Sequence, residues 1–273
     1  MNGTIDLLFW QLAAAYLFVL VLIVIVRMKG IPREKEIFIA AVRMTLQLIL
    51  VGYLLVYVFG HAHPAYTLLL VAIMLAFSIR TVIKRAKGKL SFAMKRCIAL
   101  SMTSGILVSL VYFIVIVLRL VPWYEPRYVI PIAGMIVGNS MTGVALGVNS
   151  LIEGMHGQKN KVEGALMLGA TPRIAARDIV NQAFDAAMLP TINSMVGMGI
   201  VFLPGMMTGQ ILSGTSPIVA VEYQIAIMLG IVGSVSLSVI LFVQLGYRTF
   251  FNRRSQLELQ NIDKQKHRTA KAE

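Results

Sequence analysis

The sequence predicts an all-α integral membrane protein, and three observations predict it. Hydrophobic residues make up 58% of the 273 residues and charged residues only 14%, against roughly 45–50% and about 25% in ordinary soluble domains. The mean hydropathy is +0.78. Apolar runs recur that are long enough to cross a hydrocarbon core about 30 Å thick, which takes about 20 helical residues. A water-soluble fold of this size could not bury so much apolar surface, so the lipid bilayer is part of its solvent.

Seven segments have the length, or nearly the length, and the composition of a membrane-spanning helix. Their apolar residues fill every side, and the runs are about twice as long as the strands of a membrane barrel, so helices are predicted rather than strands. The predicted spans are residues 5–26, 37–59, 65–83, 97–118, 129–151, 184–203 and 218–245.

Lysine and arginine residues are concentrated in alternate connections between these spans. Segments 27–36, 80–96 and 152–183 and the tail from Arg248 hold 22 of the 25 basic residues. Because basic residues are retained in cytoplasmic loops, the N-terminus is predicted to lie outside and the C-terminus in the cytoplasm. An even number of spans would destroy this segregation, which favours seven spans over six.

The chain divides into a transmembrane domain, residues 1–251, and a basic cytoplasmic tail, residues 252–273. The net charge of +13 would suggest a nucleic-acid partner in a soluble protein. Here the basic residues lie between apolar spans, where they act as topology signals, so no nucleic-acid partner is expected. The single cysteine, Cys97, has no partner for an intrachain disulfide or a cysteine-based metal site.

The connection 152–183, after the fifth predicted span, carries the clearest functional signal. The residues on one side of a short predicted helix are Val162, Ala165, Leu166 and Gly169. Gly169 suits a left-handed helix end. Thr171 is then the N-cap, and Pro172 the first residue, of a second helix towards Ile179. Two short helices that meet at a fixed elbow could dock into another protein; the alternative is an amphipathic segment at the membrane surface.

The fifth predicted span combines small and polar residues. Two pairs of glycines, each four residues apart, predict close helix packing at the centre of the bundle or at a dimer interface. These residues are Gly134, Gly138, Gly143 and Gly147. A second face of the same helix holds Asn139, Thr142 and Asn149, with Ser140 nearby, and Asn193 lies in the sixth span. Such polar residues favour either a water-filled path or hydrogen bonds between helices.

The connection 204–217 is bracketed by proline and rich in glycine, unlike the short outer turns elsewhere. Such a stretch is typical of an outer cap or of a broken helix that lines a cavity. It contains Met206 and Met207, which follow Met195 and Met198 in the sequence. Thioethers suit Cu(I) better than iron, and methionine more often fills gaps in apolar cores. Packing is therefore the favoured role, with Met206 and Met207 as exceptions, and no metal ligands are assigned.

The 152–183 connection resembles the coupling motif of ABC transporter permeases, which has Glu-Ala-Ala, a Gly six residues after the Glu and an Ile ten further on. The residues at those offsets are Glu163, Ala165, Gly169 and Ile179. The sequence departs at Gly164, where the family prefers Ala, and at Gln182, where importers often have Pro. The resemblance implies a coupling helix seated in a groove of an ATPase. The implied coupling residues are Glu163, Ala165, Gly169, Thr171, Pro172 and Ile179.

A closer resemblance covers most of the chain. Segments 139–142 and 203–210, together with Tyr223 and Gln224, look like those of the FetB-type permeases, which are implicated in iron export and related to plant permeases of aluminium tolerance. The resemblance implies a homodimeric permease of the bacterial plasma membrane that exports iron or a related metal species. It also implies a separate ABC ATPase subunit that uses ATP, and no cofactor on this chain, which lacks a Gly-x4-Gly-Lys-Ser/Thr phosphate loop.

The path expected for the transported species combines the polar face of the fifth span with the sixth span, the 204–217 connection and the start of the seventh span. Its expected residues are Asn139, Ser140, Thr142, Asn149, Asn193, Met206, Met207, Thr208, Gln210 and Gln224.

The main alternative is a gradient-driven secondary transporter or channel for a small polar solute. In that case Glu222, Asp185 and Arg43 would be charged relays within or near the membrane. Transport would then need neither ATP nor a partner subunit. An enzyme is not expected, because the sequence has no Ser/His/Asp spacing, no His-x-x-x-His and no paired intramembrane carboxylates. The sequence does not name the cargo.

Overall fold

The structure is a computed structural model that describes residues 8–88, 90–252 and 254–258. These residues form helices joined by short connections, without a β-strand among them, which confirms the predicted all-α class. The helices are α1 (Phe9–Met28), α2 (Glu34–Gly60), α3 (Pro64–Arg85), α4 (Phe92–Tyr112), the π-helix η1 (Phe113–Val117), α5 (Pro126–Gly157), α6 (Lys159–Met167), α7 (Pro172–Ala175), α8 (Arg177–Gly197), α9 (Gly205–Leu212), α10 (Pro217–Gly246) and the 3₁₀-helix η2 (Tyr247–Phe250).

Local sequence sets several of the helix starts. Proline stands at the first position of α3, α5, α7 and α10, where its missing N–H leaves no hydrogen bond unmade. At the start of α4, the Ser91 side chain accepts a hydrogen bond from the Met94 N–H at 3.0 Å. Such caps satisfy N–H groups that have no partner within the helix.

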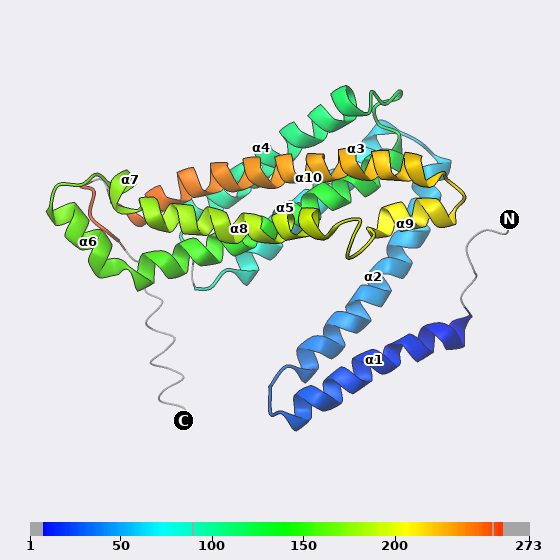
Figure 1. The fold of residues 1–273 in the computed structure, drawn as a ribbon, viewed down its shortest axis with the longest axis horizontal. Helices are drawn as coiled ribbons and strands as arrows, with labels where there is room; N and C mark the ends of the chain where they lie inside the picture. The colour runs from blue at the N-terminus through cyan, green and yellow to red at the C-terminus, as the bar shows by residue number, and fades with distance from the viewer. Residues whose placement is uncertain (1–7, 89, 253, 259–273) are drawn as a thin grey trace.

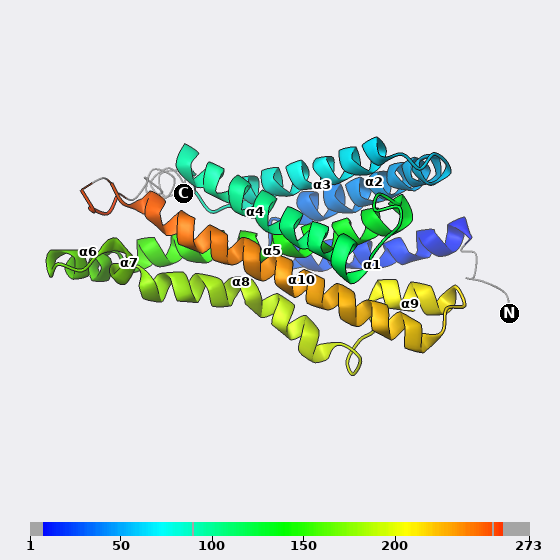
Figure 2. The same ribbon diagram turned by 90° about the horizontal axis from the view of Figure 1, so that it is seen from above.

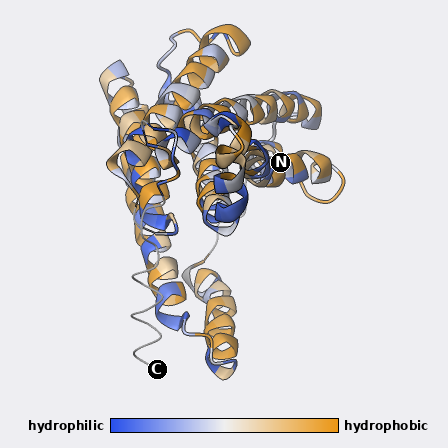
Figure 3. Ribbon diagram, turned by 90° about the vertical axis from the view of Figure 1, so that its left-hand side faces the viewer, coloured by the Kyte–Doolittle hydropathy of each residue, from blue (hydrophilic) through white to orange (hydrophobic). Residues whose placement is uncertain are grey.

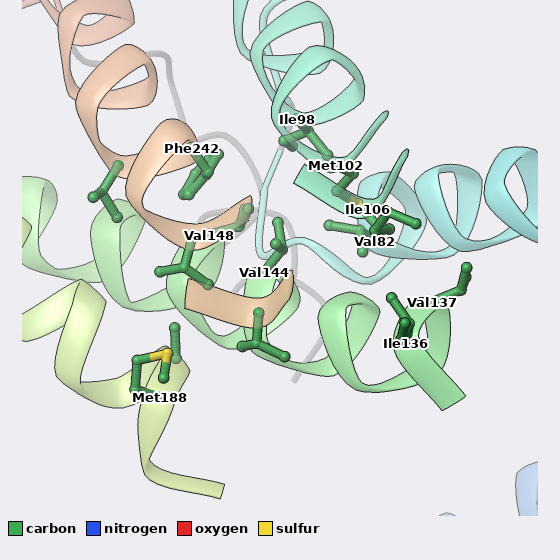
Figure 4. Close-up of a cluster of buried hydrophobic side chains, with 14 of the residues drawn as sticks. Val82, Ile98, Met102, Ile106, Ile136, Val137, Val144, Val148, Met188 and Phe242 are labelled. Carbon is green, nitrogen blue, oxygen red and sulfur yellow. The ribbon is translucent and has the colours of Figure 1, made fainter. Parts of the chain in front are cut away.

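Helix α5 lies at the centre of an elongated bundle and packs against α3, α4, α8 and α10. Figure 2 shows α10 running alongside α8 and α5 for most of its length. The core between these helices is mostly aliphatic, and Figure 4 shows some of its side chains. Val144 and Val148 of α5 and Phe242 of α10 are completely buried within it. This packing makes α5, α8 and α10 the frame on which the candidate site is built.

The α1–α2 hairpin stands apart from this bundle (Figure 1). The most apolar stretches of its two helices are 0% buried within the chain, and Figure 3 shows the hairpin hydrophobic along most of its length. A hydrogen bond between Tyr16 and Thr45 joins its two helices. Such an apolar surface is stable in lipid or against another subunit, and not in water.

Six of the described helices are long and apolar enough to cross a membrane, and α8 is not among them. The predicted sixth span, 184–203, is therefore wrong in its boundaries. Helix α8 begins earlier, at Arg177, and ends at Gly197, and residues 198–204 that follow are not helical. Polar and charged residues in its first turns lower its hydropathy, and they include Asn181, Gln182 and Asp185.

The short helix α9 follows this break. Figure 1 shows α9 beyond the end of α8, farther along the same direction, and α9 packs beside the first turns of α10. The glycine-rich connection thus contains a helix, as expected for a broken crossing, and the choice between that and an outer cap stays a prediction. With α8 and α9 taken as one crossing, the described chain passes along the bundle seven times. The sidedness itself rests on the distribution of the basic residues.

Candidate functional site

Helices α6 and α7 form an elbow at one end of the bundle, beyond the spans (Figures 1 and 2). Gly169 has a φ of +87°, the left-handed conformation predicted for the end of the first helix. The Gly169 N–H donates to the Leu166 carbonyl and the Ala170 N–H to the Ala165 carbonyl, both at 3.0 Å. The turn is therefore closed by backbone hydrogen bonds and holds one shape.

The second arm of the elbow is shorter than predicted. Thr171 lies at the N-cap in extended conformation with Pro172 after it, but its side chain makes no capping hydrogen bond. Helix α7 ends at Ala175 after a single turn, and α8 begins separately at Arg177. Ile179 therefore lies in α8 and not in the second arm, because the chain bends again at Ala176, which is completely buried.

The base of the elbow is anchored to the bundle. Val162 is fully buried and Ile179 is 1% exposed, and both belong to the main core. A Cβ added at Gly154 of α5 would lie 2.5 Å from Cγ2 of Ile179, so the two helices touch there. Lys161 Nζ lies 2.8 Å from Asp178 Oδ2, which links α6 to α8. The hydrogen bond and the charge of Lys161 lower the pKa of the Asp178 carboxyl below its ordinary value.

The tip of the elbow exposes apolar side chains. Met167 is 86% exposed, Leu168 91% and Ile174 64%. Glu163 pairs within α6 itself, with Oε1 3.8 Å from Lys159 Nζ. A cluster of exposed apolar side chains beyond the spans is typical of a surface that binds a partner. The sequence analysis did not single out these three residues. Their apolar character and their positions on either side of the Gly169 turn were the signal that could have identified them.

The two glycine pairs of α5 lie in different environments. A Cβ added at Gly143 would lie 2.8 Å from Val235 Cγ1 and 3.2 Å from the Ala187 carbonyl, and one at Gly147 would lie 3.3 Å from Ala187 Cβ. These two glycines allow α8 and α10 to approach α5. Gly134 and Gly138 have no atom within 4 Å of an added Cβ. They make no close helix contact within this chain.

Asn139 and Thr142 lie near this open part of α5 and are exposed. Asn139 Nδ2 donates to the Met135 carbonyl at 2.8 Å, and Thr142 Oγ1 donates to the Gly138 carbonyl at 3.1 Å. Both side chains therefore bond to their own helix, which leaves the Asn139 side-chain oxygen turned to the surroundings of α5. This open polar face, formed by Gly134, Gly138, Asn139 and Thr142, is the surface on which a path could lie.

Ser140 and Asn149 hold helices and loops together. Ser140 Oγ is completely buried and lies 3.0 Å from Ser234 Oγ of α10. Asn149 Oδ1 accepts a hydrogen bond from the Lys87 N–H at 2.8 Å, and the Lys87 ammonium pairs with Glu153. The structure therefore places both residues between elements, and not on the open face with Asn139.

The break between α8 and α9 contains a buried amide. Gln224 of α10 is 6% exposed, and its Nε2 lies 3.8 Å from Met198 Sδ, directly after α8. Its Oε1 is buried without a hydrogen-bond partner among the described residues. A buried amide oxygen without a partner is costly and marks a position where another group can bind. Gln224 therefore provides a buried polar group beside the break between α8 and α9.

The other expected path residues surround this break. Met207 is buried and Met206 packs against the main core. Thr208 Oγ1 donates to the Pro204 carbonyl at 3.0 Å and so stabilises the start of α9. Gln210 is half-buried in α9, whereas Asn193 is exposed on α8. Among the residues that the structure describes, no group of three or more His, Cys, Asp and Glu could hold a metal ion.

These features define a multi-pass membrane protein with a broken crossing and an elbow that extends beyond its spans, an architecture suited to transport. A model described as "Uncharacterised protein family (UPF0014)" matches residues 9–251. The chain belongs to this UPF0014 family of membrane proteins, and it is a multi-pass permease of the cell membrane.

Relatives from bacteria and plants match over most of their lengths. The "UPF0014 membrane protein YjkA" of Bacillus subtilis is 36% identical, over 91% of this chain and 97% of its own. The "Probable iron export permease protein FetB" of Escherichia coli is 35% identical, over 93% and 96%. The "Protein ALUMINUM SENSITIVE 3" of Arabidopsis thaliana is 34% identical, over 90% and 88%. No solved structure matches the chain.

Proposed function

We propose that the chain is the permease subunit of an ABC transporter, driven by a separate ATPase subunit. The observation that carries this proposal is the elbow, whose base is buried and whose apolar tip is exposed. Met167, Leu168 and Ile174 would enter a groove of the ATPase and lose contact with water there. Burying an apolar side chain of this size contributes about 1.5–3 kcal/mol, so three of them form a substantial anchor.

The anchoring of the elbow suits it to transmit force. Val162 and Ile179 pack in one core, and the Lys161–Asp178 pair links the two helices, so the elbow moves with the start of α8. A displacement of the tip by the ATPase would therefore shift α8 against α5. Helix α8 ends at the break beside Gln224, where the crossing can change shape without unfolding a continuous helix.

The transported species would move between two copies of the chain. The open polar face of Gly134, Gly138, Asn139 and Thr142 has small and polar side chains, which are unfavourable against lipid tails and favourable against another helix or water. A second copy of the chain would cover this face. A monomer in mass photometry of the purified transporter would contradict the homodimer.

Iron or a related metal species is the proposed cargo, and export the proposed direction. The support is the name of the Escherichia coli relative, an iron export permease that shares 35% of its residues over 93% of this chain. The path would pass a metal species transiently through oxygen groups such as Asn139 and Gln224, which suit iron better than thioethers do. ATP would be bound by the partner alone.

Co-purification with the ATPase tests the proposal. Replacing Met167 and Leu168 together with serine removes the apolar tip without touching the buried base. We expect at least tenfold less ATPase retained on the tagged chain. Ile31, an exposed apolar residue in the α1–α2 turn, provides the matched control, and Ile31→Ser is expected to retain the ATPase.

Normal ATPase retention by the tip variant would contradict the coupling role of the elbow. Transport by the purified chain in vesicles without nucleotide would instead favour the gradient-driven alternative. In the structure, Arg43 stacks over the Phe77 ring at 5.6 Å and pairs with neither Asp185 nor Glu222 among the described residues.

A further inference from the structure

A groove of about 630 Å³ runs between α4 with η1 on one side and α10 on the other. Its walls are apolar and include Val108, Phe113, Val117 and Leu229. Its floor contains two glycines with different surroundings. A Cβ at Gly230 would lie 2.8 Å from the Phe113 ring, whereas one at Gly233 would meet no atom within 4 Å. The groove is thus open at Gly233 and covered by Phe113 at Gly230.

The π-helix η1 forms part of one wall of this groove. Its Leu118 N–H donates to the Phe113 carbonyl at 2.9 Å, a bond across five residues instead of four. Such π-turns are rare and occur frequently at functional sites. The wall is therefore an unusual local conformation and not a regular continuation of α4.

The length of the groove matches one leaflet of a bilayer. Glu222 and Gly233 mark its two ends on α10. Eleven residues of helix span roughly 16 Å, and half of a hydrocarbon core is about 15 Å. Glu222 lies in the second turn of α10, near the end of the bundle, so Gly233 reaches the depth of the membrane centre. The groove follows the direction and the length of one acyl chain.

Among the described residues that line the groove, Glu222 alone is charged, and it lies at the end where a lipid headgroup would be. Its carboxylate makes no ion pair with any residue that the structure describes. The hydroxyls of Ser109 and Tyr112 are the only other polar side chains of the lining. An acid at the interfacial end of an apolar groove is complementary to an amphiphile with a cationic head and a single long tail in the groove.

We propose that this groove binds an amine-headed phospholipid, with the ammonium group on Glu222 and one acyl chain between α4 and α10. The lipid belongs to the leaflet at which α10 begins, the predicted outer leaflet. This site is separate from the elbow and from the α8–α9 break, so it stands independently of the coupling mechanism. A bound chain would hold α4 against α10 in the outer half of the bundle.

Photo-crosslinking with phosphatidylethanolamine that carries a diazirine on its acyl chain tests the proposal. The full chain is reconstituted into nanodiscs, in the presence of its ATPase if that co-purifies, and labelled peptides are identified by mass spectrometry. We expect labelling concentrated on α4, η1 and the first half of α10. Unlabelled phosphatidylethanolamine should compete at least fivefold better than phosphatidylglycerol.

Three variants make the test specific. Gly233→Leu fills the groove without striking the protein, and it should lower labelling at least fivefold. Glu222→Gln removes the charge and keeps the shape, so labelling should persist while the preference for phosphatidylethanolamine over phosphatidylglycerol falls to about one. Gly52→Leu is the matched control, because Gly52 on α2 also has no atom within 4 Å of an added Cβ and lies away from the groove.

Labelling spread evenly over the lipid-facing helices would overturn the proposal, because the lipid would then be only part of the surrounding bilayer. Labelling of the groove that Gly233→Leu leaves unchanged, or a preference that survives Glu222→Gln, would overturn it as well. Size-exclusion chromatography of each variant identifies one that fails to fold. In that case Gly233→Val provides the smaller filling side chain, with the same expected loss of labelling.

Discussion

The contact between Gly154 and Ile179 decides how firmly the elbow is attached. Glycine at this position has no side chain to separate α5 from α8, and Ile179 fills the space. The sequence identified Ile179 as part of a docking element, since its spacing from Glu163 fits the coupling motif. In the structure its side chain is 1% exposed and belongs to the main core, at the base of the elbow.

Gly154→Ala should destabilise the fold by about 1–3 kcal/mol, because the new methyl group would overlap Ile179. The change is measured as a fall in the thermal unfolding temperature of the purified protein. In the double variant with Ile179→Ala the overlap disappears. The loss of stability in the double variant should therefore be smaller than the sum of the losses in the two single variants. Gly157→Ala is the control, since Gly157 has open space around it. Additive effects would contradict the contact.

Ser140 and Asn139 are neighbours in sequence with separate expected roles. Ser140→Ala leaves Ser234 buried without its partner and should cost about 1–3 kcal/mol of stability. Asn139→Ala removes an exposed side chain and should leave the unfolding temperature unchanged while lowering transport in vesicles. Unfolding and transport are measured on both variants. A stability loss with Asn139→Ala, or none with Ser140→Ala, would reverse these assignments.

At the scale of elements, the broken crossing is the feature that the hydropathy pattern predicted least well. The run 184–203 is apolar enough to suggest a continuous span, but the helix starts seven residues earlier and stops at Gly197. Gly199 has a φ of +84°, and its N–H donates to the Phe202 carbonyl at 3.0 Å. Residues 198–204 could form either this local turn or a continuation of the helix. Only the packing of the segment against α10 shows that the turn is formed.

Gly199→Ala should alter this break. A side chain in the left-handed region costs roughly 1–2 kcal/mol, so the turn should rearrange and the movement of α8 should reach α9 less directly. We expect transport in vesicles to fall several-fold while ATP hydrolysis by the complex is retained. Gly205→Ala, at the open start of α9, is the control. Equal losses of both activities would show that the turn serves assembly instead.

At the scale of the whole molecule, the bundle is incomplete by itself. Helices α5, α8 and α10 bury a common hydrophobic core, whereas the α1–α2 hairpin and the open polar face of α5 remain uncovered. A second copy and the bilayer would cover them. The alternation of basic segments along the chain is consistent with seven passes only if α8 and α9 together form one of them.

Cysteine labelling tests this topology. On a Cys97→Ser background, a membrane-impermeant thiol reagent applied to intact cells should label cysteines placed at Ala62 and Ser213. Cysteines placed at Lys87 and Met167 should react only after the cells are opened, because these positions are predicted to face the cytoplasm. Protection of Ser213→Cys in intact cells would mean that α8 and α9 do not complete a crossing.

The sequence by itself determined the solvent of this protein, its helical class, the approximate spans and the Gly169 elbow. Composition and hydropathy report directly on transfer into lipid. The segment 169–172, which contains a glycine, a threonine and a proline, encodes the turn of the elbow locally. Only the tertiary structure decided which glycines of α5 are packed, that Ser140 and Ile179 are buried, where α8 ends, and that a groove with an acidic end lies beside α4. These properties depend on contacts between residues far apart in the chain, and the periodicity of a single helix carries no information about its neighbours.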